Sequence, residues 1–407
     1  MTLRTLDDLR ETAGRRVFVR TDFNVPLRDG EVADDVRIRA TLPTLTELLG
    51  RGASLVIASH LGRPGGRVVP ELSLAPVSER LGELLGHVVE FVPFVSGEGV
   101  AGPIADTSVH GPQGEEPRVV LLENLRFDPG EEANDPIFAE RLEALGDAYV
   151  GDAFGAVHRT HASVVALPTL HLSRGTPAVA GRLVQREVEV LSRLRDDPKK
   201  PYVAVLGGAK VSDKLATISA LTDRVDAILV GGAMAFTFIA AQGGEVGKSL
   251  VERDRIDEAR DALAAAEDRG VLIQLPEDVV AAPEISADAR RETVKAAEVP
   301  RDLMGLDIGP RSVEEFARTL ADARTILWNG PMGVFELEPF SAGTRGVATA
   351  IARTDAFSVV GGGDSLAAVR KFELEEQFGH LSTGGGASLE FLQGAVLPGI
   401  AVLEDRT

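Results

Sequence analysis

The sequence predicts an α/β protein with two mainly parallel sheets. Along all 407 residues, short and continuous apolar runs alternate with segments long enough to form helices. Continuous apolar runs are typical of strands that are buried on both faces, as in parallel sheets. Most runs end abruptly in a cluster of Gly, Arg, His, Lys, Asp or Asn. Polar groups at that position indicate ligand binding, because open parallel sheets bind ligands at the carboxyl ends of their strands.

The first half of the chain carries arginine and histidine at these ends. The expected strands are RVFVR (16–20), SLVIA (54–58), VVEFV (88–92), RVVLL (118–122) and AYV (148–150). A helix-length segment, VRIRATLPTLTELLGRG (36–52), separates the first two. The polar clusters that we associate with the strand ends are RTDFN (20–24), SHLGR (59–63), ENLR (123–126) and GDAFGAVHR (151–159). A stretch rich in Gly, Pro and Glu, 96–117, is expected to be a surface loop or a short insertion.

The second half carries glycine and lysine instead. Its expected strands are YVAVL (202–206), AILVG (227–231), VLIQL (271–275), TILW (325–328) and FSVV (357–360), and its expected helices include DRIDEARDALAAAEDRG (254–270). The clusters are GGAK (207–210), GGA (231–233), WNGP (328–331), GGGDS (361–365) and STGGGAS (382–388). Because the two sets of clusters differ in composition, we expect two sheets that bind two different anionic ligands.

The domain boundary is expected within 177–201. Apolar residues recur there at helical spacing, and prolines close the segment; the apolar residues are Ala180, Leu183, Val184, Val188, Leu191 and Leu194. We therefore predict two Rossmann-like domains joined by a linking helix and a hinge. The predicted ranges are 1–178 for the first domain, 179–197 for the helix and 198–393 for the second domain. The tail, 394–407, is expected to pack back on the first domain.

Composition excludes several classes of protein. The chain has no cysteine, so disulfides and thiol nucleophiles are excluded. A net charge of −19 argues against nucleic acid or a membrane surface as a partner. The sequence has no apolar run of the roughly 18 residues that span a membrane. Its first residues, MTLRTLDDLRETAGRR, lack the apolar core of a signal peptide. We therefore expect a cytoplasmic protein whose positive charge is concentrated where it binds anions.

The basic residues of the first half are candidates for an anion site. A single arginine is more often a solvated surface charge. Arginines associated with four strand ends of an otherwise acidic chain favour a site, because guanidinium groups form bidentate hydrogen bonds to carboxylate and phosphate. Asp22 and Asn24 could orient a hydroxyl of the same ligand. The basic candidates are Arg20, Arg37, His60, Arg63, Arg126, His158, Arg159 and His161.

The glycine clusters of the second half are typical of a nucleotide site. STGGGAS runs into LEFL, a turn followed by a helix whose first amides favour phosphate. In GGGDS, Asp364 suits a Mg2+ ion that keeps most of its waters. Lys210 and Lys214 would share one face if a helix started there. GGEVGKS (243–249) is not a P-loop, because Gln242 occupies the position that requires glycine.

Taken in order, these segments resemble phosphoglycerate kinases nearly from end to end. The motifs that carry the resemblance are TDFNVP, SHLGRP, VVPELSLAPV, ENLRF, GDAFGAVHRTHAS, LGGAKVSDK, GKSL, DIGP, WNGPMGVFE, GGGDS and HLSTGGGASLEFL. The resemblance implies a glycolytic kinase that moves a phosphoryl group reversibly between 1,3-bisphosphoglycerate with ADP and 3-phosphoglycerate with ATP. It implies Mg2+ with the nucleotide, in-line transfer after hinge closure, and a monomer.

The same resemblance implies the roles of single residues in the first domain. Arg37 falls on the arginine that bridges the transferring phosphoryl group. The implied contacts to the phosphoglycerate are Asp22, Phe23, Asn24, Arg37, His60, Leu61, Gly62, Arg63, Arg126 and Arg159. Thr21 and Gly151 depart from the residues usual in the family at these positions.

In the second domain the resemblance implies nucleotide contacts and catalytic groups. The implied contacts are Gly208, Ala209, Lys210, Lys214, Gly232, Gly309, Asn329, Glu336, Gly362, Gly363, Asp364 and Ser365, with Asp364 also on the metal. The implied catalytic set is Arg37, Lys210, Lys214, Gly363 and Gly386. Ala233 replaces a glycine and could tighten the adenine pocket, and Trp328 is expected in a nucleotide loop.

Two other classes of protein remain as alternatives. One is a nucleotide-dependent regulatory protein that kept the fold without the activity, and the intact lysines and arginines argue against it. The other is an NAD-linked dehydrogenase, but GGGDS is not the G-x-G-x-x-G fingerprint of dinucleotide sites.

Overall fold

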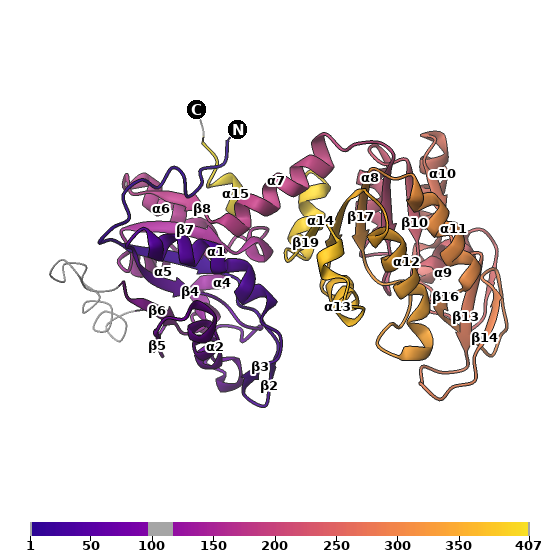
Figure 1. The fold of residues 1–407 in the computed structure, drawn as a ribbon, viewed down its shortest axis with the longest axis horizontal. Coiled ribbons are helices and arrows are strands. Elements are labelled where there is room, and N and C mark those ends of the chain that lie inside the picture. The colour runs from indigo at the N-terminus through magenta and orange to yellow at the C-terminus, as the bar shows by residue number, and fades with distance from the viewer. Residues whose placement is uncertain (1, 97–116, 406–407) are drawn as a thin grey trace. The chain divides into compact units, whose positions relative to one another are not determined.

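The computed structural model describes residues 2–96 and 117–405 of the chain, so the expected loop at 96–117 lies almost entirely outside the described residues (Figure 1). The chain divides into two compact units. Residues up to Glu189 form the first unit together with those from Val396 onward, and Val190–Ala395 form the second.

The first unit contains a six-stranded sheet in which every pair of strands is parallel. The strand order is β5-β6-β4-β1-β7-β8. The strands are β1 (Arg16–Thr21), β4 (Ser54–Ala58), β5 (Val89–Val92), β6 (Val119–Leu122), β7 (Ala148–Asp152) and β8 (Ala178–Ala180). Five of the six were predicted within two residues. β8 was missed because it is only three residues long, and it contains Ala180, which the sequence assigned to the linking helix.

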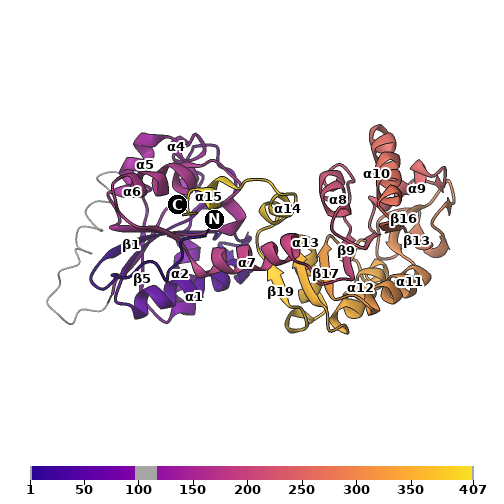
Figure 2. The same ribbon diagram turned by 90° about the horizontal axis from the view of Figure 1, so that it is seen from above.

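Helices cover both faces of this sheet. α1 and α2 lie on one face, and α5 and α6 lie on the other (Figure 2). α1 buries Ile38, Leu45 and Leu48, which recur at helical spacing and join the core beneath the sheet. The helices are α1 (Val36–Gly50), α2 (Ala75–Leu85), α4 (Pro129–Glu132), α5 (Pro136–Glu143) and α6 (Leu167–Ser173). A small hairpin pairs β2 (Leu27–Arg28) with β3 (Glu31–Val32).

Helix α7 (Arg182–Asp196) occupies the predicted linking segment and contributes residues to both units. Its first turn is held within the first unit, where Asp152 Oδ1 accepts the Leu183 and Val184 amides at 3.0 and 3.3 Å. Its last turns pack within the second unit, where Arg193 lies 4.0 Å from the centre of the Phe357 ring.

The second unit contains another six-stranded parallel sheet, with strand order β12-β10-β9-β17-β18-β19. The order reverses between β9 and β17, which is the position where open α/β sheets bind ligands. The strands are β9 (Tyr202–Leu206), β10 (Ala227–Val230), β12 (Leu272–Gln274), β17 (Thr325–Asn329), β18 (Phe357–Gly361) and β19 (His380–Ser382). The helices are α8 (Leu215–Thr222), α9 (Ala235–Ala241), α10 (Ile256–Asp268), α11 (Pro310–Ala321), α12 (Ala342–Ala352), α13 (Gly363–Lys371) and α14 (Gly386–Leu392).

An antiparallel sheet in this unit was not predicted. It has the order β14-β13-β16, from β13 (Asp278–Ala282), β14 (Glu292–Lys295) and β16 (Met304–Ile308). A separate pair joins β11 (Glu245–Val246) to β15 (Glu298–Val299). The segment GGEVGKS (243–249), which the sequence excluded as a P-loop, contains β11 and a tight bend at Gly247. A Cβ on Gly247 would lie 2.2 Å from the Pro300 carbonyl, so this glycine is required by packing.

The last described residues return to the first unit. α15 (Pro398–Ala401) lies there, and the Gly399 amide donates to the Val157 carbonyl at 2.9 Å. The Arg4 amide donates to the Leu403 carbonyl at 3.0 Å. Among the helices of the described residues, none is both long enough and apolar enough to cross a membrane.

Candidate functional site

The segments that follow β1, β4, β6 and β7 form a basic corner in the first unit. Asp22, just after β1, accepts from Arg37 Nη1 of α1 at 2.6 Å. Asn24 Oδ1 accepts the Gly62 amide at 2.9 Å, and Arg126 Nη1 donates to the Gly62 carbonyl at 2.6 Å. The loops after three different strands are therefore linked through these side chains.

Two residues that the sequence did not single out organise this corner. The Asn124 side chain accepts the Leu61 and Arg126 amides, each at 3.1 Å, and donates to the Leu61 carbonyl at 2.7 Å. Ser59 Oγ accepts the Phe23 amide at 2.8 Å and donates to the Thr21 carbonyl at 2.9 Å. Both side chains are fully buried, so they act on the loops and not on a ligand.

The predicted residues of the corner differ in what they can offer a ligand. Phe23 and Leu61 belong to the hydrophobic core, so only their main chains can face a ligand. Arg63 is exposed, while Arg37 and Arg159 are half-buried. Arg20 is fully buried, and its Nε donates to Ser163 Oγ at 2.8 Å. Arg20 is therefore a basic candidate that supports the corner, because its side chain is buried beneath the surface that a ligand could reach.

Burial and neighbouring arginines keep the histidines of this corner neutral. Desolvation lowers the pKa of His60 well below its ordinary value, and the charges of Arg20 and Arg126 lower it further. The pKa of His161 falls to about 4 for the same two reasons. Burial also lowers the pKa of Arg126, and the charge of Arg20 lowers it further. Such mutual repulsion among cations is relieved by an anionic ligand.

The corresponding corner of the second unit is built from main chain. The Gly207 amide donates to the Asn329 carbonyl at 2.9 Å, and the Gly208 amide donates to the Pro331 carbonyl at 3.1 Å. A Cβ on Gly207 would lie 2.1 Å from the Pro331 carbonyl, and one on Gly232 would lie 2.6 Å from the Gly208 amide nitrogen. Gly207 and Gly232 are therefore required by close packing of the loops after β9, β10 and β17.

Gly363 and Gly386 differ from these packed glycines. They are the first residues of α13 and α14, and no described atom lies within 4 Å of the position that a Cβ would take. Neither has a positive φ, so the local backbone does not require glycine. Free space beside the first residue of a helix suits the close approach of a phosphate to the helix N-terminus.

The two lysines do not lie on one helical face. α8 begins only at Leu215, after a turn, so the condition for a helical pair, a helix that starts at Lys210, is not met. Lys210 is exposed, whereas Lys214 is half-buried and its Nζ donates to Asn329 Oδ1. Burial lowers the pKa of Lys214, and the charge of Asp364 partly opposes this effect.

The remaining nucleotide candidates follow strands of both the parallel and the antiparallel sheet of the second unit. Ser365 Oγ is buried and accepts the Gly330 amide at 2.6 Å. Gly309 precedes α11, and a Cβ there would lie 2.3 Å from the Asp278 carboxyl carbon. Ala209, Asp364 and Glu336 are exposed, and Gly362 has a φ of +91°.

The expected position of Trp328 was wrong. The residue lies in β17 and not in a loop, and its side chain is fully buried in the core of the second unit. Its Nε1 donates to the Gly330 carbonyl at 2.8 Å, so a hydrogen bond links the buried ring to the glycine corner.

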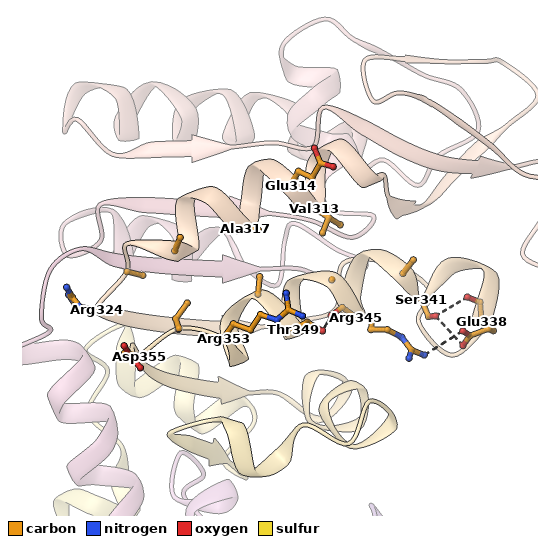
Figure 3. Close-up of a pocket in the computed structure, with 16 residues that line it drawn as sticks. Val313, Glu314, Ala317, Arg324, Glu338, Ser341, Arg345, Thr349, Arg353 and Asp355 are labelled. Atoms are coloured by element: carbon orange, nitrogen blue, oxygen red, sulfur yellow. Dashed lines mark hydrogen bonds and ion pairs between the residues drawn. The ribbon is translucent and has the colours of Figure 1, made fainter.

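A surface groove of about 920 Å3 lies between α11 and α12 (Figure 3). Small side chains such as Ala317 line it, with arginines and acids at its rim. It contains none of the residues predicted for the site. Among the described residues, no cluster of three or more His, Cys, Asp or Glu could hold a metal ion.

Comparison with known proteins places this geometry in a family. The family model described as phosphoglycerate kinase matches residues 6–395. Phosphoglycerate kinase of Salinispora tropica is 56% identical over 99% of this chain and 100% of its own length. That of Thermus thermophilus is 55% identical with the same coverage. The solved structure from Coxiella burnetii has a TM-score of 0.85 at 40% identity and covers 99% of both chains. The chain therefore belongs to the phosphoglycerate kinase family.

Proposed function

We propose that the basic corner of the first unit binds the phosphoglycerate and that the glycine corner of the second unit binds the nucleotide. As a phosphoglycerate kinase, the protein is an ATP:3-phosphoglycerate 1-phosphotransferase of glycolysis. It transfers a phosphoryl group reversibly between 1,3-bisphosphoglycerate with ADP and 3-phosphoglycerate with ATP. The contrast between the two corners is the observation that supports our assignment of the ligands.

The first corner suits a small polyanion. Arg63, Arg126 and Arg159 supply guanidinium groups for carboxylate and phosphate oxygens. Asp22 and Asn24 hold Arg37 and Gly62 in place through bonds of 2.6 and 2.9 Å. His60 is neutral, so it can donate one hydrogen bond to a ligand without adding charge.

The second corner suits a nucleotide. Gly363 and Gly386 begin α13 and α14 and have free space at their Cβ positions, so we assign the phosphates to these helix N-termini. Lys210 and Lys214 add positive charge beside them, and Asn329 orients Lys214. We assign the contacts to the adenine and the ribose to Gly232, Gly309 and Glu336.

Transfer between these ligands needs no general base. The attacking group is a phosphate oxygen of ADP or the carboxylate of 3-phosphoglycerate, and a carboxyl group with a pKa of about 4 is ionised near neutral pH. The protein must therefore position the reactants and neutralise the migrating phosphoryl group. We assign neutralisation to Arg37, Lys210 and Lys214, with the amides of Gly363 and Gly386.

Magnesium and hinge closure belong to the same proposal. Asp364 is an oxygen donor whose charge acts on Lys214, so it fits a Mg2+ ion that is held mainly by waters and nucleotide phosphates. Bound there, the ion would neutralise phosphate charge. In-line transfer requires reacting atoms about 3–3.5 Å apart. We therefore propose that the hinge around α7 closes on both ligands, in a cytoplasmic monomer.

A coupled assay of ATP-dependent phosphorylation of 3-phosphoglycerate tests the proposal. We expect turnover that requires Mg2+ and falls strongly in Asp364→Ala, while Glu375→Ala, which removes an exposed carboxylate beyond α13, leaves it unchanged. Binding of ADP without any turnover would instead support a regulatory protein that kept only the fold.

A further inference from the structure

The loop between β17 and α12 carries Glu336, which we place on the ribose side of the nucleotide. The Glu336 side chain is exposed, but its two neighbours are anchored in separate apolar clusters. Phe335 packs in the core that contains Trp328, and Leu337 packs against the cluster that contains Phe340. The loop therefore presents one carboxylate from a backbone that is fixed on both sides.

The base of this loop is held by Asp307 of β16. Asp307 Oδ2 accepts the Gly343 amide, near the start of α12, at 2.6 Å. A Cβ on Gly333 would lie 2.2 Å from Asp307 Oδ1, so the loop also passes directly over this carboxylate. Asp307 thus fixes the chain at Gly333 and at Gly343, on either side of the segment around Glu336.

The middle of the loop is held by a lysine from a different element. Lys371 is the last residue of α13, and its Nζ donates to the Phe335 carbonyl at 2.7 Å and to the Glu336 carbonyl at 3.1 Å. A cation is favoured at the C-terminus of a helix. The same helix begins at Gly363, in the proposed phosphate loop. α13 therefore connects the proposed phosphate contacts at one end to the proposed ribose contact at the other.

We propose that Lys371 is a positioning residue for the nucleotide. It fixes the main chain of Glu336 relative to Gly363–Ser365, so that one nucleotide can contact both at once. Lys371 acts through the Phe335 and Glu336 carbonyls and does not itself contact the nucleotide. This inference rests on the proposed nucleotide site, and in particular on the ribose role of Glu336.

The test replaces Lys371 with methionine, which keeps the apolar stem and removes the ammonium group. We expect the KM for ATP to rise roughly tenfold, because two charge-assisted hydrogen bonds that fix the loop are lost. The KM for 3-phosphoglycerate and kcat at saturating ATP should stay within about twofold, because the loss concerns nucleotide binding alone. Lys371→Arg can still donate to two carbonyls and should restore most of the affinity for ATP. Lys295→Met is the matched control, since Lys295 is exposed and pairs with Glu298 at 2.9 Å.

Inorganic tripolyphosphate separates positioning from a merely structural role. It has phosphates but no ribose, so its inhibition constant should be the same for wild type and Lys371→Met. A rise in this constant by as much as the KM for ATP would overturn the inference. An equal loss in kcat and in the affinities for both substrates would overturn it too, because that pattern indicates general damage to the fold.

Glu336→Gln distinguishes this inference from the proposal on which it rests. If the KM for ATP does not change in Glu336→Gln, the ribose assignment fails, and the inference fails with it. If it rises in Glu336→Gln but not in Lys371→Met, only the role of Lys371 is refuted. If Lys371 acts through Glu336, the double variant should bind ATP no more weakly than Glu336→Gln alone.

Discussion

The two proposed ligand corners lie at the carboxyl ends of the strands in two similar parallel sheets. One is built mainly from charged side chains, and the other is built mainly from main chain. In the first unit the corner is made of charged side chains that link loops to one another, as Asp22 and Arg37 do at 2.6 Å. In the second unit the loops pack main chain against main chain, as at Gly207 and Pro331, and leave free space at the Cβ positions of Gly363 and Gly386. A small polyanion needs charge, whereas a nucleotide needs space beside phosphate-binding amides. If the ligands bind as we propose, the position in the sheet is common to both corners, and the composition of the loops distinguishes the two ligands.

The largest expected effect tests whether side-chain charge dominates the first corner. Arg37→Ala should lower kcat roughly 10²–10³-fold, because it removes a charge that we assign to neutralising the migrating phosphoryl group. Affinity for ADP, measured by calorimetry, should hardly change. Arg39→Ala is the control, since Arg39 is exposed on the same helix and pairs with Asp35 at 2.8 Å. An unchanged kcat in Arg37→Ala would remove Arg37 from the mechanism.

The next effect tests whether glycine in the second corner serves packing or ligand binding. Gly207→Ala should lower the free energy of unfolding by about 1–3 kcal/mol, because its Cβ would lie 2.1 Å from a carbonyl oxygen. Gly386→Ala should leave stability unchanged or raise it by up to about 1 kcal/mol. Its kcat should fall roughly tenfold or more, because the methyl group occupies the proposed phosphate space.

Urea denaturation and steady-state kinetics on the same preparations provide both readouts. Full activity in Gly386→Ala would show that the open space before α14 is not used. The distinction between packed and open glycines would then carry no functional meaning.

A smaller effect concerns a feature that the two units share. Each has a buried carboxylate that caps a helix, Asp152 for α7 and Asp307 for α12, and burial raises the pKa of both to about 7. Because the folded pKa lies above the ordinary value of 3.8, each group stabilises the fold fully only below about pH 4. This contribution is lost as the pH rises towards 7.

Asp307→Asn should therefore change the pH dependence of stability. Between pH 4 and 7, wild type should lose on the order of 1–3 kcal/mol relative to this variant, which cannot ionise. Urea denaturation at several pH values measures the difference. A constant difference across this range would show that Asp307 does not titrate there.

The smallest effect uses the single tryptophan to compare the corners directly. Trp328 touches the glycine corner through its bond to the Gly330 carbonyl, but its ring is buried. ADP should therefore change its fluorescence only slightly, by about a tenth or less, since the ring remains shielded from water. 3-Phosphoglycerate alone should change it even less. A larger response to 3-phosphoglycerate than to ADP would reverse the assignment of the two corners.

The sequence predicted the parallel sheets well because their strands are continuously apolar. It missed the antiparallel sheet because continuous apolar runs are a weak signal in the strands of that sheet. β14, for example, reads Glu-Thr-Val-Lys and is largely exposed. It identified the family through residues that face the ligand corners, but not the residues beneath them. Asn124 and Ser59 act by binding main chain from loops distant in sequence, which no local pattern reveals. Lys371 looks like any lysine at a helix end until the Phe335 carbonyl is seen beside it.

The return of the last residues to the first unit has a consequence for biosynthesis. A nascent chain emerges from its N-terminus, and domains generally fold as they appear. Here the first unit lacks α15 and the Leu403 carbonyl, which accepts the Arg4 amide, until the whole second unit has been synthesised. Gly399 lies against Val157, two residues before Arg159, so this late segment supports the basic corner itself. The second unit is therefore synthesised in full before the first unit is finished, and a chain that terminates before α15 would lack part of the support of the basic corner.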